Sequence, residues 1–298
     1  MCGIVGLFLK DKSLEPQLGA MLTEMLITMT DRGPDSAGIA IYGGADDGAG
    51  KITVQSPHPE KDFADLDREL KDAIGKPVGM VIRSTHAVLE VPVDQVEVAR
   101  AALAELRPGL KVMSVGDSLE IYKEVGLPKD VASRFDLAKM RGTHGIGHTR
   151  MATESAVTTN GAHPFSTGSD QCLVHNGSLS NHSSLRRMLA HEGIYTETMN
   201  DTEVGAAYLT WRMKNGATLG EALEGTLEDL DGFFTFVVGT HDGFGVVRDP
   251  IACKPAVMAE TDQYVAFGSE YRALVSLPGI DTARVWEPEP ATVYFWNH

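Results

Sequence analysis

Long hydrophobic runs are missing from the sequence, since no apolar stretch approaches the roughly 18 residues that a membrane-spanning helix needs. The N-terminus also lacks a basic segment, and its short apolar run from Ile4 to Leu9 is broken by Gly6, which argues against a signal peptide. Cysteine is scarce, and Cys2, Cys172 and Cys253 form an odd set without metal-type spacing. These absences argue against a membrane protein and a disulfide-rich secreted domain, and they favour a reduced, cytoplasmic compartment.

Positive charge is also in short supply. The chain has 26 Lys and Arg residues against 41 Asp and Glu residues, which gives a net charge of −15. A surface this acidic repels phosphate groups, so nucleic acid and anionic membranes are poor partners. The ordinary role of such a surface is solubility, and it does not select a substrate. No P-loop, Gly-rich dinucleotide fingerprint or cysteine cluster occurs, so the sequence predicts no metal, ATP, NAD or iron–sulfur site in this chain.

Hydrophobic periodicity predicts an α+β chain with antiparallel sheets, because strands come first, helices follow and strands return. Strands are expected at 3–9, 38–42, 51–55, 78–90, 111–115, 233–240, 244–248, 256–259, 264–268 and 291–296, with strand-to-loop segments at 145–153 and 172–181. Helices are expected at 17–30, 60–75, 94–106, 118–125, 182–192, 201–213 and 219–230, and a hairpin or loop tip at 43–50. No low-complexity linker occurs, so we predict one domain over 1–298 with an insertion at about 45–140. Cys172 and Cys253 lie in apolar runs, which predicts buried, inert thiols.

A cysteine at position 2 suggests an N-terminal nucleophile. Methionine aminopeptidase accepts small second residues, so removal of Met1 would leave Cys2 with both a thiol and a free α-amino group. A free cysteine thiol has a pKa of about 8.5, and an α-amino group titrates at about 7.7 to 8.0. The amine can therefore accept the thiol proton and later return it to a leaving group, which makes one residue both nucleophile and base. The alternative is that a cysteine stands at this position by accident.

The segment LVHNGSLSN at 173–181 offers groups that could stabilise an oxyanion. Acyl transfer needs hydrogen-bond donors for the developing negative charge. The side-chain amide of Asn176 and the backbone of Gly177 could supply them at a strand exit, and glycine permits a close approach to a ligand. An Asn-Gly pair after a strand is also an ordinary turn.

Two charged residues could hold the α-groups of a glutamine substrate. A carboxylate favours a bidentate arginine, and Arg150 in GHTRMAT is available. An ammonium favours a carboxylate, which Asp201 in NDTE could provide at a helix start. Asp201 has an ordinary alternative role as the N-cap of that helix.

Taken together, these segments closely resemble the class II glutamine amidotransferase domain, whose nucleophile is an N-terminal cysteine. The matching motifs are MCGIVG at 1–6, DRGPDSAG at 31–38, GHTRMAT at 147–153, AHPF at 162–165, HNGSLSN at 175–181 and NDTE at 200–203. RDPIACKP at 248–255 and FGSE at 267–270 are similar to later strands of the same domain. Each motif alone is weak, but six in family order over about 270 residues are specific.

The resemblance implies a four-layer αββα sandwich of two antiparallel sheets between helices. It implies that Cys2 is the nucleophile, that Asn176 and Gly177 form the oxyanion hole, and that Arg150 and Asp201 hold the glutamine α-groups. Further matches are Met151, Thr153 and His163, which line the glutamine pocket of the family, and Arg32, which supports the nucleophile. His175, which precedes the oxyanion asparagine, is expected to be structural.

Within the family, the segments at 147–165 and 172–186 are most similar to the amidotransferase part of glutamate synthase and its free-standing relatives. The sequence ends about where such a domain would end, and the resemblance implies a hetero-oligomer. A separate synthase subunit, carrying FMN and iron–sulfur clusters, would then accept the ammonia, as in glutamate or N-methylglutamate synthase. Two alternatives stay open: an N-terminal-cysteine hydrolase of another amide, and a non-catalytic glutamine-sensing module.

Overall fold

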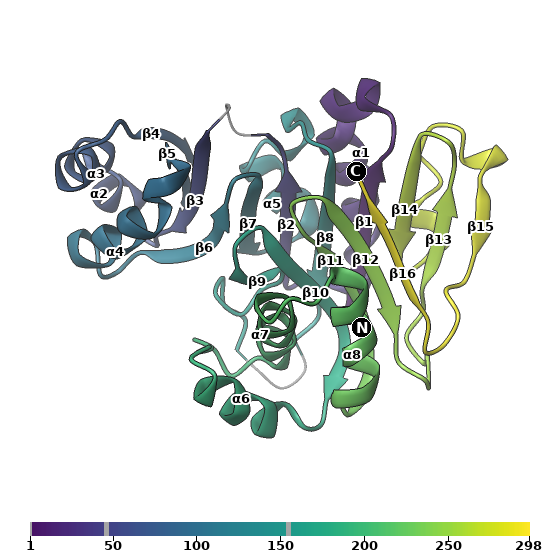
Figure 1. Cartoon of the computed structure of the whole chain (residues 1–298). Coiled ribbons are helices and arrows are strands. Elements are labelled where there is room, and N and C mark those ends of the chain that lie inside the picture. The colour runs from purple at the N-terminus through teal and green to yellow at the C-terminus, as the bar shows by residue number, and fades with distance from the viewer. Residues whose placement is uncertain (1, 45–47, 153–155) are drawn as a thin grey trace.

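Two antiparallel sheets form the body of the computed structural model, which describes residues 2–44, 48–152 and 156–298 (Figure 1). The seven-stranded sheet contains, in spatial order, β15 (Arg284–Trp286), β13 (Val257–Glu260), β14 (Tyr264–Gly268), β1 (Gly3–Leu9), β8 (His144–Arg150), β2 (Ser36–Tyr42) and β7 (Leu119–Val125). The five-stranded sheet contains β16 (Val293–Asn297), β12 (Gly243–Arg248), β11 (Gly232–Gly239), β10 (Gln171–Leu179) and β9 (Phe165–Gly168).

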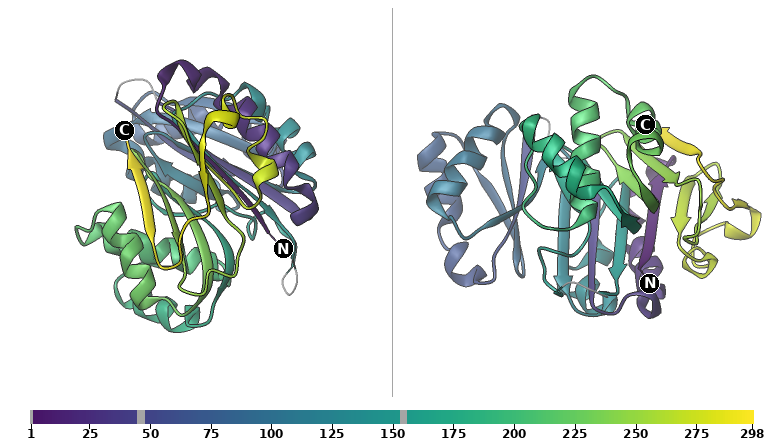
Figure 2. Two further views of the ribbon diagram at one scale, coloured as in Figure 1. Left: turned by 90° about the vertical axis from the view of Figure 1, so that its right-hand side faces the viewer. Right: turned by 90° about the horizontal axis from the view of Figure 1, so that it is seen from below.

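Helices cover the outer face of each sheet, so the body has four layers. Helices α1 (Leu18–Thr28) and α5 (Pro128–Arg134) pack on the seven-stranded sheet. The five-stranded sheet is covered by α6 (His182–His191), α7 (Asp201–Lys214) and α8 (Leu219–Asp229). The side view in Figure 2 shows the purple α1 and the green helices on opposite sides of the paired sheets. The predicted αββα sandwich is therefore confirmed.

Strand β1 shows how the sequence produces this packing. All seven of its residues are buried, because each face of the strand meets a different apolar layer. Ile4 and Phe8 point into the core between the sheets, whereas Val5, Leu7 and Leu9 join the core under α1. This alternation follows from the two-residue period of a strand. A strand that is buried on both faces reads as a continuous apolar run, which is why 3–9 could be predicted from sequence.

A separate lobe lies beside the body, on the left of Figure 1. It contains a four-stranded sheet in the order β4 (Gly79–Arg83), β5 (His86–Pro92), β3 (Ala49–Gln55) and β6 (Lys111–Gly116). Helices α2 (Pro59–Asp62), α3 (Leu66–Ile74) and α4 (Val96–Leu106) cover one face of that sheet and enclose an apolar core of their own. The lobe lies within the predicted insertion, but β7 and α5, which follow it, belong to the body.

The structure corrects several predicted elements in this region. The expected strand at 78–90 is a hairpin that turns at Ser84, whose φ is +55°. The expected helix at 60–75 is interrupted by Asp65 at φ +55° and becomes α2 and α3. The expected helix at 118–125 is strand β7, which pairs with β2. Strand β3 lies in a different sheet from β2, so the two strands around 43–50 form no hairpin with each other; residues 45–47 lie outside the described part of the chain.

One buried carboxylate joins the lobe to the body. Asp170, in the turn between β9 and β10, accepts hydrogen bonds from the backbone N–H groups of Asp117, Ser118 and Leu119 at 2.7 to 2.9 Å. The Ser118 hydroxyl adds a fourth bond at 3.1 Å. These donors form the turn between β6 and β7, so Asp170 fixes the point where the chain leaves the lobe and enters the main sheet. A carboxylate with several N–H donors stays well stabilised when buried.

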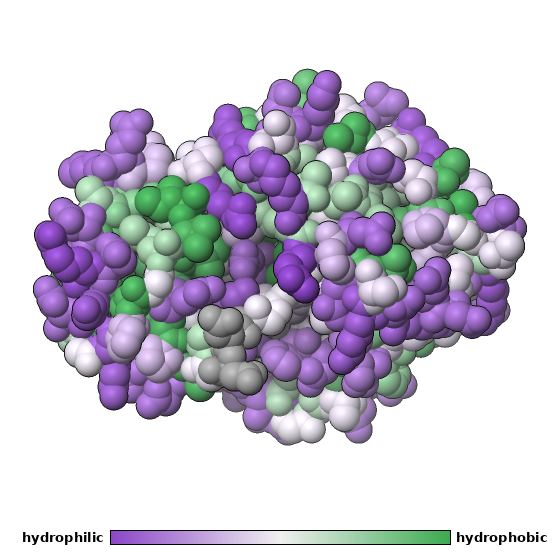
Figure 3. Space-filling model, turned by 90° about the horizontal axis from the view of Figure 1, so that it is seen from above, coloured by the Kyte–Doolittle hydropathy of each residue, from purple (hydrophilic) through white to green (hydrophobic). Residues whose placement is uncertain are grey.

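The lobe carries part of the exposed hydrophobic surface of the molecule. In the view from above, the largest continuous hydrophobic area lies on the left, over the lobe (Figure 3). Exposed apolar side chains of the lobe include Val81, Ile82, Val93, Val98 and Val112. Among the helices of the described segments, none has the length and apolar character needed to cross a membrane.

Candidate active site

A cavity of about 880 Å³ opens at one end of the two sheets. Nearly all of the predicted site residues line it: Cys2, Arg150, Met151, His163, Asn176, Gly177 and Asp201. They come from the start of β1, the end of β8, the segment before β9, the end of β10 and the start of α7. Thr153 lies outside the described residues, and Arg32 lies behind Cys2 rather than on the cavity wall.

Cys2 is placed by the pairing of β1 in the centre of the seven-stranded sheet. Gly3 pairs with Thr149, so Cys2 lies beside the end of β8, where Arg150 enters the cavity. A side chain at Gly3 would come within 2.8 Å of Met29, so only glycine lets the strand approach this closely. The Ser269 hydroxyl accepts a hydrogen bond from the Ile4 amide at 2.9 Å. The terminus therefore rests on a rigid strand rather than on a loop.

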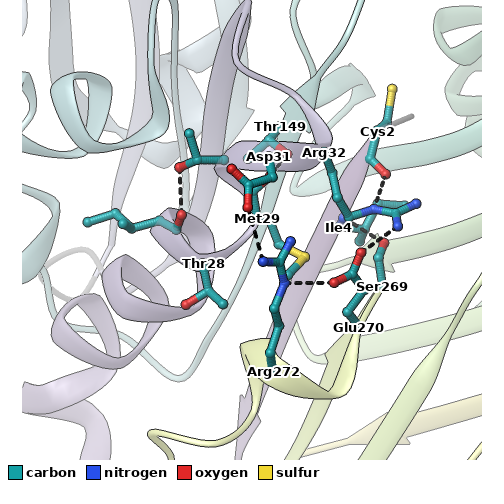
Figure 4. A network of polar contacts seen from close by, with 12 residues as sticks. Cys2, Ile4, Thr28, Met29, Asp31, Arg32, Thr149, Ser269, Glu270 and Arg272 are labelled. Atoms are coloured by element: carbon teal, nitrogen blue, oxygen red, sulfur yellow. Dashed lines mark hydrogen bonds and ion pairs between the residues drawn. The ribbon is translucent and has the colours of Figure 1, made fainter.

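A network of charged side chains holds the Cys2 carbonyl (Figure 4). Arg32 donates to this carbonyl from Nε at 2.9 Å and to Glu270 from Nη1 at 2.7 Å. Arg272 contacts the other carboxylate oxygen of Glu270 at 2.7 Å and Asp31 at 3.2 Å. The thiol points away from these ion pairs. Arg32 thus holds the backbone carbonyl of Cys2, while the thiol lies on the side away from the ion pairs.

We expect Glu270→Gln to lower the free energy of unfolding by about 1 to 3 kcal/mol, since it removes the charged partner of the buried Arg32. Hydrogen bonding from Arg32 holds the pKa of Glu270 below its usual value of 4.5. The ionised Glu270 carboxyl stabilises the fold, because its pKa is lower in the folded than in the unfolded chain. This contribution is complete above the pKa that the group has in the unfolded chain, and it is lost as pH falls through the pKa that it has in the folded chain. Urea unfolding should therefore show a constant difference between wild type and variant above about pH 5, and a shrinking one below about pH 4.5.

The pair of Lys10 with Glu260 supplies a matched control, because Lys10 is 30% exposed whereas Arg32 is 7% exposed. Because that pair is partly hydrated, Glu260→Gln should change stability by less than about 1 kcal/mol. Equal losses in the two variants would contradict a special role for Glu270 beneath the nucleophile.

Asn176 and Gly177 lie at the end of β10, where they face Cys2. The Asn176 side-chain amide donates to the Cys2 carbonyl at 3.4 Å, and the residue is 4% exposed. Gly177 has a φ of +154°, and a side chain there would meet the Phe233 carbonyl at 1.9 Å. No other residue fits this position. Both residues line the cavity, which suits the Asn176 amide and the Gly177 N–H as donors to an oxyanion.

A hydroxyl joins two histidines on the cavity wall. Thr202 Oγ1 lies 3.0 Å from His175 Nδ1 and 3.2 Å from His163 Nε2. His148 stacks on His163 with ring centroids 4.0 Å apart. Burial lowers the pKa of His148 to about 3 and lowers the pKa values of His163 and His175 as well. These rings are therefore neutral at pH 7, and the wall they form is polar but uncharged.

The polar residues of the NDTE segment, 200–203, have different roles in the structure. Asn200 is the N-cap of α7 and accepts from the Thr202 amide at 2.9 Å, so the alternative role of Asp201 as the cap is wrong. Asp201 instead accepts from the Leu179 amide at 2.9 Å and lines the cavity. Glu203 is buried and accepts from the Glu197 and Thr198 amides at 2.6 and 2.7 Å. Asn200 and Glu203 therefore fix the start of α7, and Asp201 is not needed as a cap.

Sequence reasoning missed Thr202, Lys254 and His148. Thr202 follows Asp201 directly, and Lys254 follows Cys253 in the loop after β12 and lines the cavity. His148 precedes Arg150 by two residues and shares its strand. The prediction that Cys253 is buried is also wrong, since it is exposed, whereas Cys172 is buried as expected. Residues 249–256 form a loop whose carbonyls are held by Arg248, so the apolar run there is not a strand.

Comparison with known proteins agrees with this arrangement. Residues 148–276 match the family model described as "Glutamine amidotransferase domain". Over 298 residues the chain is 71% identical to the "Glutamine amidotransferase-like protein GlxB" of Rhizobium meliloti, covering 100% of this chain and 99% of that protein. The chain belongs to the class II glutamine amidotransferases. It is also 35% identical to a "Putative glutamine amidotransferase" of Methanothermobacter thermautotrophicus, covering 98% of both chains.

The solved structure of the glutamine phosphoribosylpyrophosphate amidotransferase of B. subtilis supports the fold of this amidotransferase chain. It superimposes with a TM-score of 0.62 at 20% identity, and the match covers 99% of this chain but only 47% of the other. At this identity the likeness concerns the fold alone. The present chain therefore spans about half the length of that protein.

Proposed function

We propose that this chain hydrolyses glutamine to glutamate and ammonia through a γ-glutamyl thioester on Cys2, after removal of Met1. One observation carries the proposal. Cys2 directly precedes the buried central strand β1, its carbonyl is held by Arg32 and Asn176, and it lines the same cavity as Arg150 and Asp201. A nucleophile, an oxyanion donor and two opposite charges for an amino acid thus meet in one place.

Cys2 would supply both the nucleophile, its thiol, and the base, its α-amino group. The thiol gives its proton to the free α-amino group of Cys2, and the sulfur attacks the amide carbon of glutamine. The negative oxygen of the tetrahedral intermediate accepts hydrogen bonds from Asn176 and Gly177. The C–N bond then breaks, and the α-ammonium gives its proton to the leaving nitrogen, which departs as ammonia. Water attacks the thioester with the same amine as base, and glutamate leaves as the thiol forms again.

Substrate recognition is assigned to the charged residues at the cavity wall. Arg150 is 8% exposed and enters from the end of β8, which suits a bidentate contact with the α-carboxylate. Asp201 would hold the α-ammonium through Oδ1, whose contact with the Thr202 hydroxyl is long at 3.5 Å, whereas its Oδ2 accepts from the Leu179 amide at 2.9 Å. Met151, His163 and Thr153 are proposed to complete the pocket, with Thr153 assigned by its motif alone.

We expect Arg150→Ala to raise the KM for glutamine about 10- to 100-fold with a smaller effect on kcat, because a charge-assisted hydrogen bond contributes about 1.5 to 3 kcal/mol. Steady-state release of glutamate measures both constants. Arg212→Ala, on the outer part of α7, is the control and should leave KM unchanged. An unchanged KM in Arg150→Ala would favour the alternative of an N-terminal-cysteine hydrolase that acts on an amide without amino-acid α-groups.

The partner is proposed to be a synthase subunit that accepts the ammonia, as in a glutamate or N-methylglutamate synthase complex. This finer assignment rests on the motifs at 147–165 and 172–186. FMN and iron–sulfur clusters would lie on that subunit, and no cofactor is assigned to this chain. We also propose that the lobe at 49–116 is an insertion into the amidotransferase fold. Purification of the native complex, with flavin and iron measured, tests the partner assignment, and a chain that purifies alone would contradict it.

A glutamine-sensing module is the remaining alternative. It would bind glutamine without forming a thioester, and Met1 could then be retained. The direct test is to incubate the purified protein with glutamine and measure glutamate and ammonia together. Equal molar release of both supports the proposed hydrolysis, whereas saturable binding without release of either would favour a sensor.

A further inference from the structure

Lys123 is a buried cation that the proposed chemistry does not use. It lies on β7, the strand that enters the main sheet from the lobe, and is 3% exposed. Burial lowers its pKa to about 7, although the charges of Glu203 and Glu197 act in the opposite direction. A buried ammonium group is unfavourable unless its three N–H donors find acceptors. The position of those acceptors therefore shows what the lysine holds.

All three acceptors belong to one short segment of the cavity wall. The Lys123 ammonium donates to the carbonyls of Ala162 at 2.9 Å, Pro164 at 3.1 Å and Asn160 at 3.3 Å. It also lies 4.4 Å from the centre of the Phe165 ring, on the side where a cation is attracted. Between these carbonyls lies His163, which lines the cavity together with Asn160 and Gly161.

A glycine in the adjacent strand makes room for this arrangement. Gly38 pairs with Lys123 across β2 and β7. A side chain at Gly38 would lie 2.0 Å from the His163 carbonyl oxygen and 2.6 Å from the Lys123 Cβ. The absence of a side chain there lets the segment pass directly over the sheet. Lys123 and Gly38 thus act on the same stretch of backbone.

The next residue of β7 holds the same segment at its other end. The Thr159 hydroxyl donates to Glu124, which also accepts from Thr85 at 3.0 Å and pairs with Arg134 at 3.4 Å. Two neighbouring side chains of one strand therefore bind residues 159 to 164 through four contacts. Strand β7 is the edge strand of the seven-stranded sheet and pairs with β2 along its whole length. A paired strand is a more precise support than a loop, so β7 fixes the position of this cavity wall.

We infer that Lys123 is a positioning residue, which holds the segment 159–164 in place as one wall of the glutamine pocket, with Glu124 supporting the same segment through Thr159. The inference rests on the proposed function, because it assigns glutamine to this cavity. It makes β7 the structural link between the lobe and the pocket, since Asp170 fixes the turn from which this strand begins.

The test replaces Lys123 with methionine, which keeps the length of the side chain and removes its donors. The matched control is Lys51→Met, another buried lysine, which donates to Glu120 at 2.7 Å and to the Gly43 carbonyl at 3.2 Å, away from the cavity. Hydrogen exchange of peptides covering 156–165 should become about tenfold faster in Lys123→Met and stay unchanged in Lys51→Met. The KM for glutamine should rise about tenfold or more in Lys123→Met alone, with kcat changed by less than about threefold.

Thr159→Val provides a second variant that is safe for folding, because Thr159 is only partly buried. It should speed exchange at 159–161 and raise KM by about threefold. Unchanged exchange and KM in the folded variants would overturn the inference, and so would equal effects in Lys51→Met. If Lys123→Met does not fold, Thr159→Val decides between these outcomes. If the wild type releases no glutamate, the proposed function fails, while exchange still decides whether Lys123 and Thr159 hold this segment.

Discussion

Cys2→Ala should abolish glutamine hydrolysis, with a loss of about 10⁴-fold or more in kcat/KM, because removing a catalytic nucleophile leaves only the contribution of the remaining site. The variant should fold normally, since alanine also permits removal of Met1 and the carbonyl that Arg32 and Asn176 hold is retained. Glutamate release and circular dichroism, measured on the same preparation, separate chemistry from folding.

Cys253→Ala is the control for this prediction, because Cys253 is exposed and could react with reagents that target thiols. It should keep wild-type activity. Cys172 is buried, and burial raises the pKa of its thiol to about 12, so it should stay unreactive. Substantial hydrolysis by Cys2→Ala would exclude the thioester mechanism.

A related variant tests the role of the α-amino group. Insertion of a lysine between Met1 and Cys2 blocks removal of Met1, because methionine aminopeptidase requires a small second residue. The thiol then remains, but its own residue no longer offers a free amine as base. We expect this variant to be as inactive as Cys2→Ala, and activity equal to wild type would show that another group takes the proton.

Asn176→Ala should lower kcat about 10²- to 10³-fold with little change in KM, which is the usual effect of removing one oxyanion donor. The donor is needed mainly in the transition state, when the carbonyl oxygen carries negative charge. Pre-steady-state measurement of ammonia release should show that formation of the thioester is the slowed step.

Asn181→Ala is the control for Asn176→Ala. Its side chain bonds the Asp229 carbonyl and the Asp231 amide, so this variant should lose stability but keep kcat. If Asn176→Ala instead raised KM and kept kcat, Asn176 would be a ground-state binding group rather than an oxyanion donor.

The sequence predicted those parts of the molecule whose signals are local. Strand 3–9 and the helices at 182–192, 201–213 and 219–230 agree with β1, α6, α7 and α8 within two residues at each end. Their apolar residues follow the period of the element and face one core. The site residues could be predicted because each belongs to a short motif, although only the pairing of β1 with β8 brings Cys2 beside Arg150.

What the sequence could not predict depends on contacts between distant segments. Strand β7, where a helix was expected at 118–125, carries the charged residues Glu120, Lys123 and Glu124. In the structure these side chains are satisfied by Lys51 and by the backbone and hydroxyl groups of residues 159–164. Such partners are far away in sequence, so periodicity alone carries no information about them.

The N-cap of α7 is a second feature that the local sequence could not decide. Asn200 and Asp201 are both good N-cap residues, and their propensities are nearly equal. The Leu179 amide decides between them, because it occupies an oxygen of Asp201 and leaves Asn200 as the cap. A residue at the end of β10 thus determines which of the two side chains caps the helix and which one lines the cavity.

The central claim is that a processed Cys2 attacks a glutamine-like amide in this cavity. Intact mass of the purified chain, before and after exposure to a glutamine-like diazoketone, tests it most directly. We predict loss of Met1 and one covalent adduct per chain, which glutamine prevents and which persists in Cys253→Ala but disappears in Cys2→Ala. Retention of Met1, or a processed terminus that forms no adduct in the native complex, would contradict the claim.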